Sequence, residues 1–424
     1  MSSDRAGADR SSPKERTPVA KKEKPDNTRD VFTPSQLVAA VLLGGTCVLY
    51  YQIVPIALGA MVDQLHFPET RIGLVYGVYG LFISLSCLAS VRFVRKLDWR
   101  ITTATGSVVA ALAFVGCLWS REYGAMLGFH ALAGVGCGLA YGPVLACLGD
   151  THMPARSYAL VFLSQVAQGA VLVEIVPRYF SPGILLAGTF KTMIGCCVAC
   201  IALSLMMPRA GRRRARGPVT QRIRAGGRLR IFALPIAFSA MFLIFAGDSA
   251  IWAYMERIVA AAGHPPAFAG TALMVSLIAG AVGSLAASWV GMRLGFLLPM
   301  IVAVALSIAS VAMLQLSPLA TAIVVAIAIN GWAWNFGSAY RMAVVALLDA
   351  TGRWPAAIPA AQLLGGSFGA ATGGFLVSGK GFLGLYIYAS CLWLAALGAY
   401  SIDFVAHRMW TETETSGNDE KSEP

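Results

Sequence analysis

The chain has 424 residues, of which 57% are hydrophobic and 13% charged, and its formal net charge is +12. So low a charged fraction excludes an ordinary soluble domain, in which about a quarter of the residues are charged. The positive charge does not indicate a nucleic-acid partner, because the basic residues lie in short segments between long apolar runs. Basic residues in that position face anionic lipid headgroups instead.

Apolar runs of about twenty residues fill the chain from Ser35 to His407. A helix needs roughly 20 apolar residues to cross the hydrocarbon core of a bilayer, so each run predicts one membrane-spanning helix. The predicted spans are residues 36–60, 71–90, 102–119, 123–148, 157–177, 184–207, 231–255, 267–290, 296–315, 320–345, 355–377 and 382–404. The predicted fold class is therefore all-α integral membrane, with twelve transmembrane helices in two six-helix bundles.

The domain organisation follows from the position of the polar segments. We expect a disordered N-terminal tail, an N-terminal six-helix bundle, a basic linker, a C-terminal six-helix bundle and a C-terminal tail, over residues 1–34, 35–207, 208–230, 231–406 and 407–424 respectively. With both tails and the linker on one side, that side holds 26 Lys and Arg residues and the other side five. Because positive loops stay in the cytoplasm, the tails and linker are predicted to be cytoplasmic. The expected location is the plasma membrane, with a bacterial inner membrane favoured.

The nine cysteines all fall inside predicted spans, where a cysteine behaves as a small polarisable hydrophobe. Cys197 and Cys200 have the spacing of a metal-binding pair, but no second pair or nearby histidine completes a site. We expect no metal and no cofactor.

The two halves repeat one another around the fourth and tenth spans. Each of these spans is followed by an aspartate, an arginine, a glutamine nine residues after the arginine, and a glycine four residues later. The two sets are Asp150, Arg156, Gln165 and Gly169, and Asp349, Arg353, Gln362 and Gly366. Such repeats are typical of transporters that carry substrate between two bundles.

With its twelve spans, six-plus-six division, basic central linker and short basic loops after spans 2 and 8, the chain resembles the major facilitator superfamily. The family's loop motif after span 2 is altered, with Ser90 at the first glycine position and Phe93 or Val94 where an aspartate is expected. The copy after span 8 keeps its glycines and Arg293. Basic residues of the cytoplasmic loops are the gating candidates: Arg95, Lys96, Arg100, Arg156, Arg293 and Arg353.

Two further motifs bear on the branch of the family. His130, Gly134, Gly136 and Gly138 match the family's span 4 pattern, with histidine in the arginine position. The glycine-proline signature of antiporters is absent from span 5. Span 7, with Gly247, Asp248 and residues 252–257, resembles the sugar- and drug-efflux branches.

Ionisable residues inside spans are costly unless they face a cavity or a partner, and they therefore indicate function. Asp248 and Arg341 are expected to line a cavity or to form a structural ion pair. Asp248 is the first candidate for proton coupling and Glu174 the second. At the outer helix ends, Asp63, Glu256 and Arg257 are expected to reach water.

Polar and aromatic side chains near the middle of the spans give the remaining substrate-binding candidates, with ordinary hydrogen bonding between helices as the alternative. Together with the charged candidate Arg341, they are Tyr51, Gln52, His130, Gln165, Gln168, Lys191, Asn330, Trp334 and Asn335. For Lys191 and Glu174, the alternative is that their side chains extend to the outer lipid headgroups.

No phosphate-binding loop and no hydrolase motif occurs, so we expect neither an enzyme nor an ATP-driven pump. The sequence predicts a secondary transporter of a small organic anion, sugar or drug-like metabolite that works by alternating access. Coupling of this transport to protons is part of the hypothesis. Its expected partners are that solute and the lipid bilayer, with the protein acting as a monomer. The alternative is a transporter-like receptor or scaffold that moves nothing.

Overall fold

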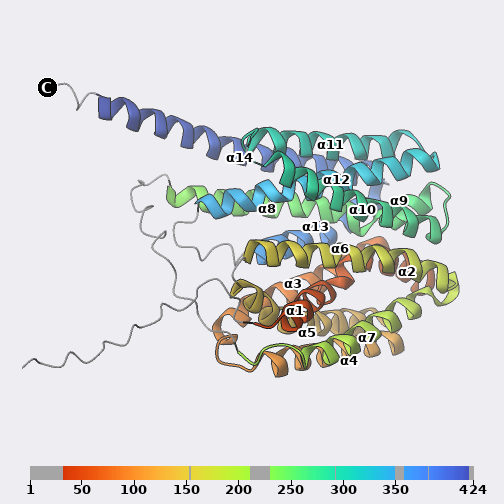
Figure 1. Cartoon of the computed structure of the whole chain (residues 1–424). Helices are drawn as coiled ribbons and strands as arrows, with labels where there is room; N and C mark the ends of the chain where they lie inside the picture. Colours follow the sequence, from red (N-terminus) through yellow and green to blue (C-terminus); the bar gives the residue numbers. More distant parts are fainter. Residues whose placement is uncertain are drawn as a thin grey trace, which may run out of the picture.

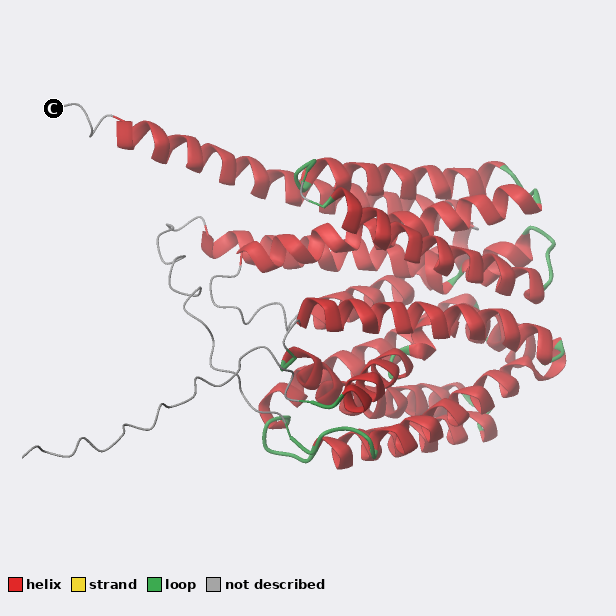
Figure 2. Cartoon of the chain, viewed as in Figure 1, coloured by secondary structure: helices red, strands yellow, loops and turns green. Residues whose placement is uncertain are grey.

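The computed structural model describes residues 32–151, 154–210, 230–291, 293–348, 358–380 and 382–419. All regular secondary structure in these residues is helical (Figure 2). Most of the predicted N-terminal tail and linker, Asp349 and Arg353 lie outside the described residues. The same is true of the side chain of Arg156.

The described helices form two groups that lie one above the other in Figure 1. The first consists of α1 (Pro34–Thr46), α2 (Leu49–Leu65), α3 (Glu69–Phe93), α4 (Trp99–Trp119), α5 (Tyr123–Gly149), α6 (Pro154–Tyr179), the 3-10 turn η1 (Pro182–Ile184) and α7 (Leu185–Ser204). The second consists of α8 (Arg230–Ala253), α9 (Met255–Ala261), α10 (Pro266–Val290), α11 (Leu297–Leu316), α12 (Ala320–Leu348), α13 (Ile358–Lys380) and α14 (Phe382–Asp419). We call them the N-bundle and the C-bundle.

Eleven segments of the described chain are long and apolar enough to cross a membrane. The one predicted span that is not among these eleven, residues 355–377, corresponds to α13, whose Gln362 and many glycines lower its hydropathy. The prediction of an all-α membrane fold is therefore confirmed. We call the end of the molecule at which α7 ends and α8 begins the linker end, and the opposite end the distal end.

Hydropathy did not predict the breaks inside two spans. The first span divides at Cys47 and Val48 into α1 and α2, and the seventh divides at Tyr254 into α8 and α9. The first break occurs within continuous apolar sequence, whereas the second lies where the apolar run gives way to Glu256 and Arg257. The last helix also differs from expectation, since α14 continues to Asp419, beyond the predicted end of its span at residue 404.

The bundles meet along two main helix pairs, α3 with α13 and α6 with α10, while α2 contacts α8, α9 and α10. Glycine makes the first pairing possible. A side chain at Gly73 would strike the carbonyl oxygen of Ala370, and a Cβ at Gly77 would lie 3.0 Å from that of Ser367. Small residues at such positions allow helix backbones to approach closely in a membrane.

Prolines supply the other close contacts between the bundles. Because Pro55 has no N–H, it leaves the carbonyl of Tyr51 without its helical partner. That carbonyl accepts a hydrogen bond of 3.1 Å from the indole of Trp252 in the opposite bundle. Pro177 likewise frees the carbonyl of Val173, and Gly270 of α10 packs directly against it.

Polar contacts join the bundles at the distal end. Arg257 of α9 forms an ion pair of 2.7 Å with Asp63 of α2, and Arg178 of α6 donates to the hydroxyl of Thr271 at 3.2 Å. The hydroxyl of Tyr254 lies 3.1 Å from the carbonyl oxygen of Glu69 in the N-bundle. These contacts close the distal end of the molecule.

Candidate functional site

A buried charge pair lies inside the C-bundle. Asp248 of α8 and Arg341 of α12 are 5% and 3% exposed, and the Asp248 Oδ2 and an Arg341 terminal nitrogen are 4.0 Å apart. Arg341 also donates to the carbonyl of Trp334 at 3.1 Å and to the hydroxyl of Ser338 at 2.6 Å. The 4.0 Å separation is too long for a hydrogen bond, so the two charges attract without satisfying one another.

Both members of the pair retain unused hydrogen-bonding capacity. Among the described atoms, the Oδ2 of Asp248 and the Nε of Arg341 are buried without a hydrogen-bond partner. So is the indole N–H of Trp393, which lies against the backbone at Gly247. Burying a charge without hydrogen bonds is costly. Such an arrangement is typical of a site that a ligand, water or proton completes.

Aromatic rings lie beside the pair on the side of the N-bundle. The guanidinium of Arg341 is 5.8 Å from the ring centre of Phe245. Trp334 packs against Phe245 at 6.0 Å and against Trp252 at 6.2 Å between ring centres. Trp334 therefore lies in the same group of side chains as Arg341.

The N-bundle reaches this group through Tyr51. Its hydroxyl hydrogen-bonds to that of Ser249, the residue after Asp248, and its ring lies 5.4 Å from that of Tyr76. Gln52 packs against Gly169 of α6, and its Oε1 is buried without a partner in the described structure. The structure thus brings Tyr51, Trp334, Asp248 and Arg341 to one region at the contact between the bundles.

Three other candidates lie within the N-bundle. His130 is fully buried; its Nε2 is 2.8 Å from the Tyr50 hydroxyl and its Nδ1 2.8 Å from the Met126 carbonyl. Gln165 donates to the Gly44 carbonyl at 3.4 Å and to Tyr141 at 3.3 Å. Gln168 donates to the Leu42 carbonyl and accepts from Thr46. Apart from the His130–Met126 contact, which lies within α5, these contacts join neighbouring helices of the N-bundle.

The remaining candidates are dispersed. Lys191 is exposed on α7. Glu174 forms an ion pair of 2.6 Å with Arg178, one helical turn later. In α12, Asn330 is 6% exposed with its amide nitrogen unpartnered in the described structure, and Asn335 donates to the Gly331 carbonyl of its own helix at 3.1 Å.

At the linker end, Arg95 donates two hydrogen bonds, of 2.5 and 2.8 Å, to the carboxylate of Asp150 at the end of α5. This two-point geometry makes the contact directional as well as attractive. Arg100 donates to the Met207 carbonyl and so joins the start of α4 to the end of α7. Lys96 and Arg293 are exposed.

Sequence reasoning missed the contribution of Ser249 and Trp393 and misjudged Glu256. It expected Glu256 to reach water, as Asp63 does at 51% exposure. Glu256 is instead 2% exposed. Hydropathy marks the end of a span but carries no information on which neighbouring helix extends past that end.

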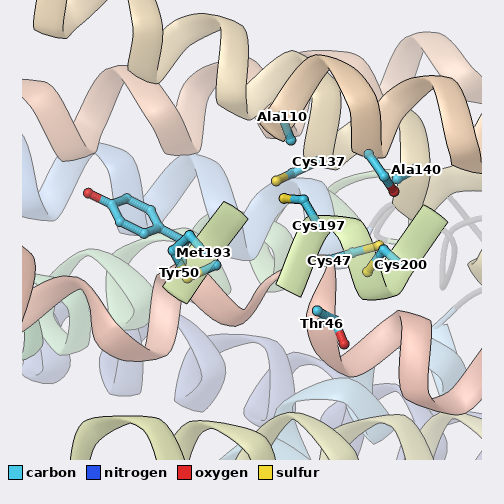
Figure 3. Close-up of a pocket in the computed structure, with 10 residues that line it drawn as sticks. Thr46, Cys47, Tyr50, Ala110, Cys137, Ala140, Met193, Cys197 and Cys200 are labelled. Atoms are coloured by element: carbon cyan, nitrogen blue, oxygen red, sulfur yellow. The ribbon is translucent and has the colours of Figure 1, made fainter. Parts of the chain in front are cut away.

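Four cysteines gather around a cavity of about 10 Å³ in the N-bundle, as Figure 3 shows: Cys47, Cys137, Cys197 and Cys200. Tyr50 and Met193 complete much of its lining. No described group of three or more His, Cys, Asp and Glu residues has a geometry that would hold a metal ion. All nine cysteines are free thiols.

Residues 3–173 match the family model described as Major Facilitator Superfamily. No curated protein sequence matches the chain. The fold resembles that of nucleoside transporter NupG, with a TM-score of 0.66 at 14% identity, over 89% of this chain and 99% of that one. It also resembles a D-xylose-proton symporter, with a TM-score of 0.69 at 15% identity, over 86% and 97%.

A third similar structure is a bacterial homologue of the human lysosomal transporter Spinster, in an inward-facing and unoccupied conformation. Its TM-score is 0.65 at 12% identity, over 90% of this chain and 98% of that one. At these identities the likeness to solved structures concerns the fold. The N-terminal part of the chain therefore matches the Major Facilitator Superfamily model, and the chain as a whole shares its fold with these three transporters.

Proposed function

We propose that this protein is a secondary active transporter that carries a small organic solute across the plasma membrane by alternating access. The observation that carries the proposal is the incompletely satisfied Asp248–Arg341 pair, which lies beside the aromatic contact between the two bundles. Intramembrane charges with unused hydrogen-bonding capacity indicate a pathway for substrate or protons.

The orientation proposed for the molecule places the linker end in the cytoplasm, on the basis of the 26 basic residues assigned to that side. The closed distal end then faces outward. In that orientation we assign the conformation to a state that is closed on the outer side. Transport requires a second state in which the distal contacts, such as the Asp63–Arg257 pair, separate.

The proposed substrate is a small organic anion with an apolar or aromatic body. Arg341 has an unpartnered Nε among the described atoms and so offers a donor to a carboxylate or similar group. Trp334 and Phe245 offer apolar surface beside it. A few convergent polar groups among aromatic rings is the usual composition of a small-molecule site. The nucleoside and xylose transporters of similar fold favour sugar-like solutes as the alternative.

Asp248 is proposed to couple transport to protons. When Asp248 carries a proton, Arg341 is released to bind an anion; when it is ionised, the two side chains attract one another across 4.0 Å. Competition of this kind links proton binding to substrate binding through a single arginine. Glu174 is the weaker candidate, because Arg178 holds it at 2.6 Å.

Reconstituted protein tests this mechanism. The Asp248→Asn variant keeps the shape of the side chain but does not titrate. It should lose accumulation driven by a pH gradient by at least tenfold, while counterflow exchange of substrate at equal pH continues. Glu174→Gln is the matched control, and it should accumulate substrate as the unmodified protein does.

Two results would contradict the proposal. If Asp248→Asn accumulates substrate at the unmodified rate with the same pH dependence, Asp248 has a structural role. If vesicles that contain the unmodified protein bind anions but never accumulate or exchange them, the receptor alternative is correct.

A further inference from the structure

A second carboxyl lies buried between the bundles, at the distal end. Glu256 belongs to α9, beyond the membrane-spanning part of α8, which ends at Ala253. Its side chain is directed at Gly59 of α2, and the carboxyl occupies the space in which a side chain at position 59 would lie. Of the described contacts between the bundles, this one places an acid directly against the backbone of the opposite bundle.

The carboxyl of Glu256 is poorly supplied with partners. Its Oε2 is buried without a hydrogen bond in the described structure, and the nearest cation, Arg257, is 3.9 Å away. Arg257 is already engaged by Asp63 of α2 at 2.7 Å. Because Glu256 is 2% exposed and its one nearby cation is shared with Asp63, burial favours the neutral acid at this contact.

The other charged groups around this carboxyl are few. The helices that contact α9 are α2, α8 and α10. In α10 there is no Asp, Glu, Lys, Arg or His, and the acid of α8, Asp248, lies eight residues earlier along the chain. In α2 the only ionisable acid is Asp63, which repels a second negative charge. Burial, offset in part by Arg257, raises the pKa of Glu256 from 4.5 to about 7.

We propose that Glu256 is a proton-controlled latch for the distal end. The protonated acid packs against Gly59 and holds α9 on α2, while loss of the proton drives the carboxyl toward water and separates the two helices. The latch rests on the proposed function in one respect: it requires the distal end to open during transport. It is independent of substrate identity and of Asp248.

The direction of the pH effect follows from linkage. The closed state binds the proton more tightly than the open state, in which Glu256 meets water and its pKa returns to its usual range near 4.5. The stabilisation of the closed state is therefore complete below about pH 4.5 and is lost as the pH rises through 7. The opening equilibrium should grow about tenfold for each pH unit in that window and become level above it.

Spin labels test the latch without any transport measurement. Leu65→Cys in α2 and Ala261→Cys in α9 place one label on each side of the contact, near the distal ends of the two helices. Cys196→Ser and Cys391→Ser remove the native thiols that are not buried. Pulsed electron paramagnetic resonance on the full-length protein in lipid nanodiscs, without substrate, then reports the distance between α2 and α9 from pH 5 to pH 8.5.

We expect one short distance at pH 5 and a growing population of long distances toward pH 8.5. The Glu256→Gln variant has no proton to lose and should keep the short distance at every pH. Asp63→Asn is the matched control: it leaves Glu256 in place and should retain a pH response, with a smaller amplitude because Arg257 is freed to pair with Glu256.

Gly59→Ala provides an independent check, because its methyl group would occupy the place of the carboxyl. It should populate long distances already at pH 5. The proposal is overturned if the unmodified protein keeps one distance from pH 5 to 8.5, if Glu256→Gln responds to pH as the unmodified protein does, or if Gly59→Ala keeps the unmodified profile. Failure of substrate uptake with an intact distance response would reject the transport proposal and leave the latch standing.

Discussion

His130 shows how a chemically versatile side chain can be fully occupied by its own helix bundle. Both ring nitrogens have partners in the N-bundle, and the ring packs 6.0 Å from that of Phe190. Its position in the sequence matches the arginine of the family motif, yet the contacts are those of a residue that holds α2 and α5 together. We therefore expect a contribution to stability.

The His130→Ala variant tests this expectation. It removes two hydrogen bonds, leaves the Tyr50 hydroxyl without that partner and opens a cavity, and should lower the free energy of unfolding by about 3 kcal/mol. Thermal unfolding in detergent measures the loss, and substrate affinity of the folded fraction should not change. A variant that unfolds at the unmodified temperature but binds substrate more weakly would instead place His130 in the substrate pathway.

Sequence reasoning identified the polar residues at membrane depth but not their surroundings. Asp248 and Arg341 lie within 4.0 Å of one another, whereas Lys191, selected by the same criterion, is exposed. The difference depends on how each helix is rotated about its axis, and with 3.6 residues per turn a span of mixed small and apolar residues carries little information on rotation. Glu256, which was expected to reach water, is buried because it packs against Gly59 of the neighbouring α2.

At the scale of the helices, α13 has two glycine faces. Gly365 and Gly369 pack against the backbone of α8 in the same bundle, while Gly374 packs so closely against the N-bundle that an added Cβ would lie 2.5 Å from the Glu69 carbonyl oxygen. Opposite it, Gly73 of α3 faces Ala370 of α13 and the Tyr254 hydroxyl. One helix therefore takes part in both folding and closure.

These two kinds of contact should respond differently to a single methyl group. Gly369→Ala meets the Ala246 backbone inside the C-bundle and should lower the unfolding temperature. Gly73→Ala meets the C-bundle alone, so both bundles should fold normally while closure of the distal end weakens and transport falls severalfold. Thermal unfolding and uptake, measured on both variants, separate the effects; equal losses of stability would contradict this division.

The boundaries of the helices were largely predictable, since apolar runs end where loops begin. Span 2, predicted over 71–90, corresponds to Glu69–Phe93, and span 4, predicted over 123–148, to Tyr123–Gly149. The break at Cys47 was not predictable, because the apolar sequence continues across it. The break at Tyr254 lies at the end of the apolar run, and there the Tyr254 hydroxyl contacts the Glu69 carbonyl of the N-bundle and the Ala370 carbonyl of its own bundle.

For the molecule as a whole, orientation is the property that the charge distribution predicts most directly. Reporter fusions at Gly217, in the linker, and at Gly263, in the turn after α9, should report opposite sides of the membrane, with Gly217 cytoplasmic. The physical reason is the 26 to five excess of Lys and Arg on one side. Fusions that report the same side would contradict the single membrane crossing predicted between these two positions, and with it the twelve-span arrangement.

The carbonyl that Pro55 leaves free has a mechanical consequence. The hydrogen bond from Trp252 to Tyr51 joins two helices, but it is not part of the internal ladder of either. When the bundles part, this bond breaks while every hydrogen bond within α2 and α8 persists. At this contact, the free energy of opening therefore depends on side chains and on the water that hydrates one carbonyl and one indole. Neither α2 nor α8 has to unwind when the bundles separate.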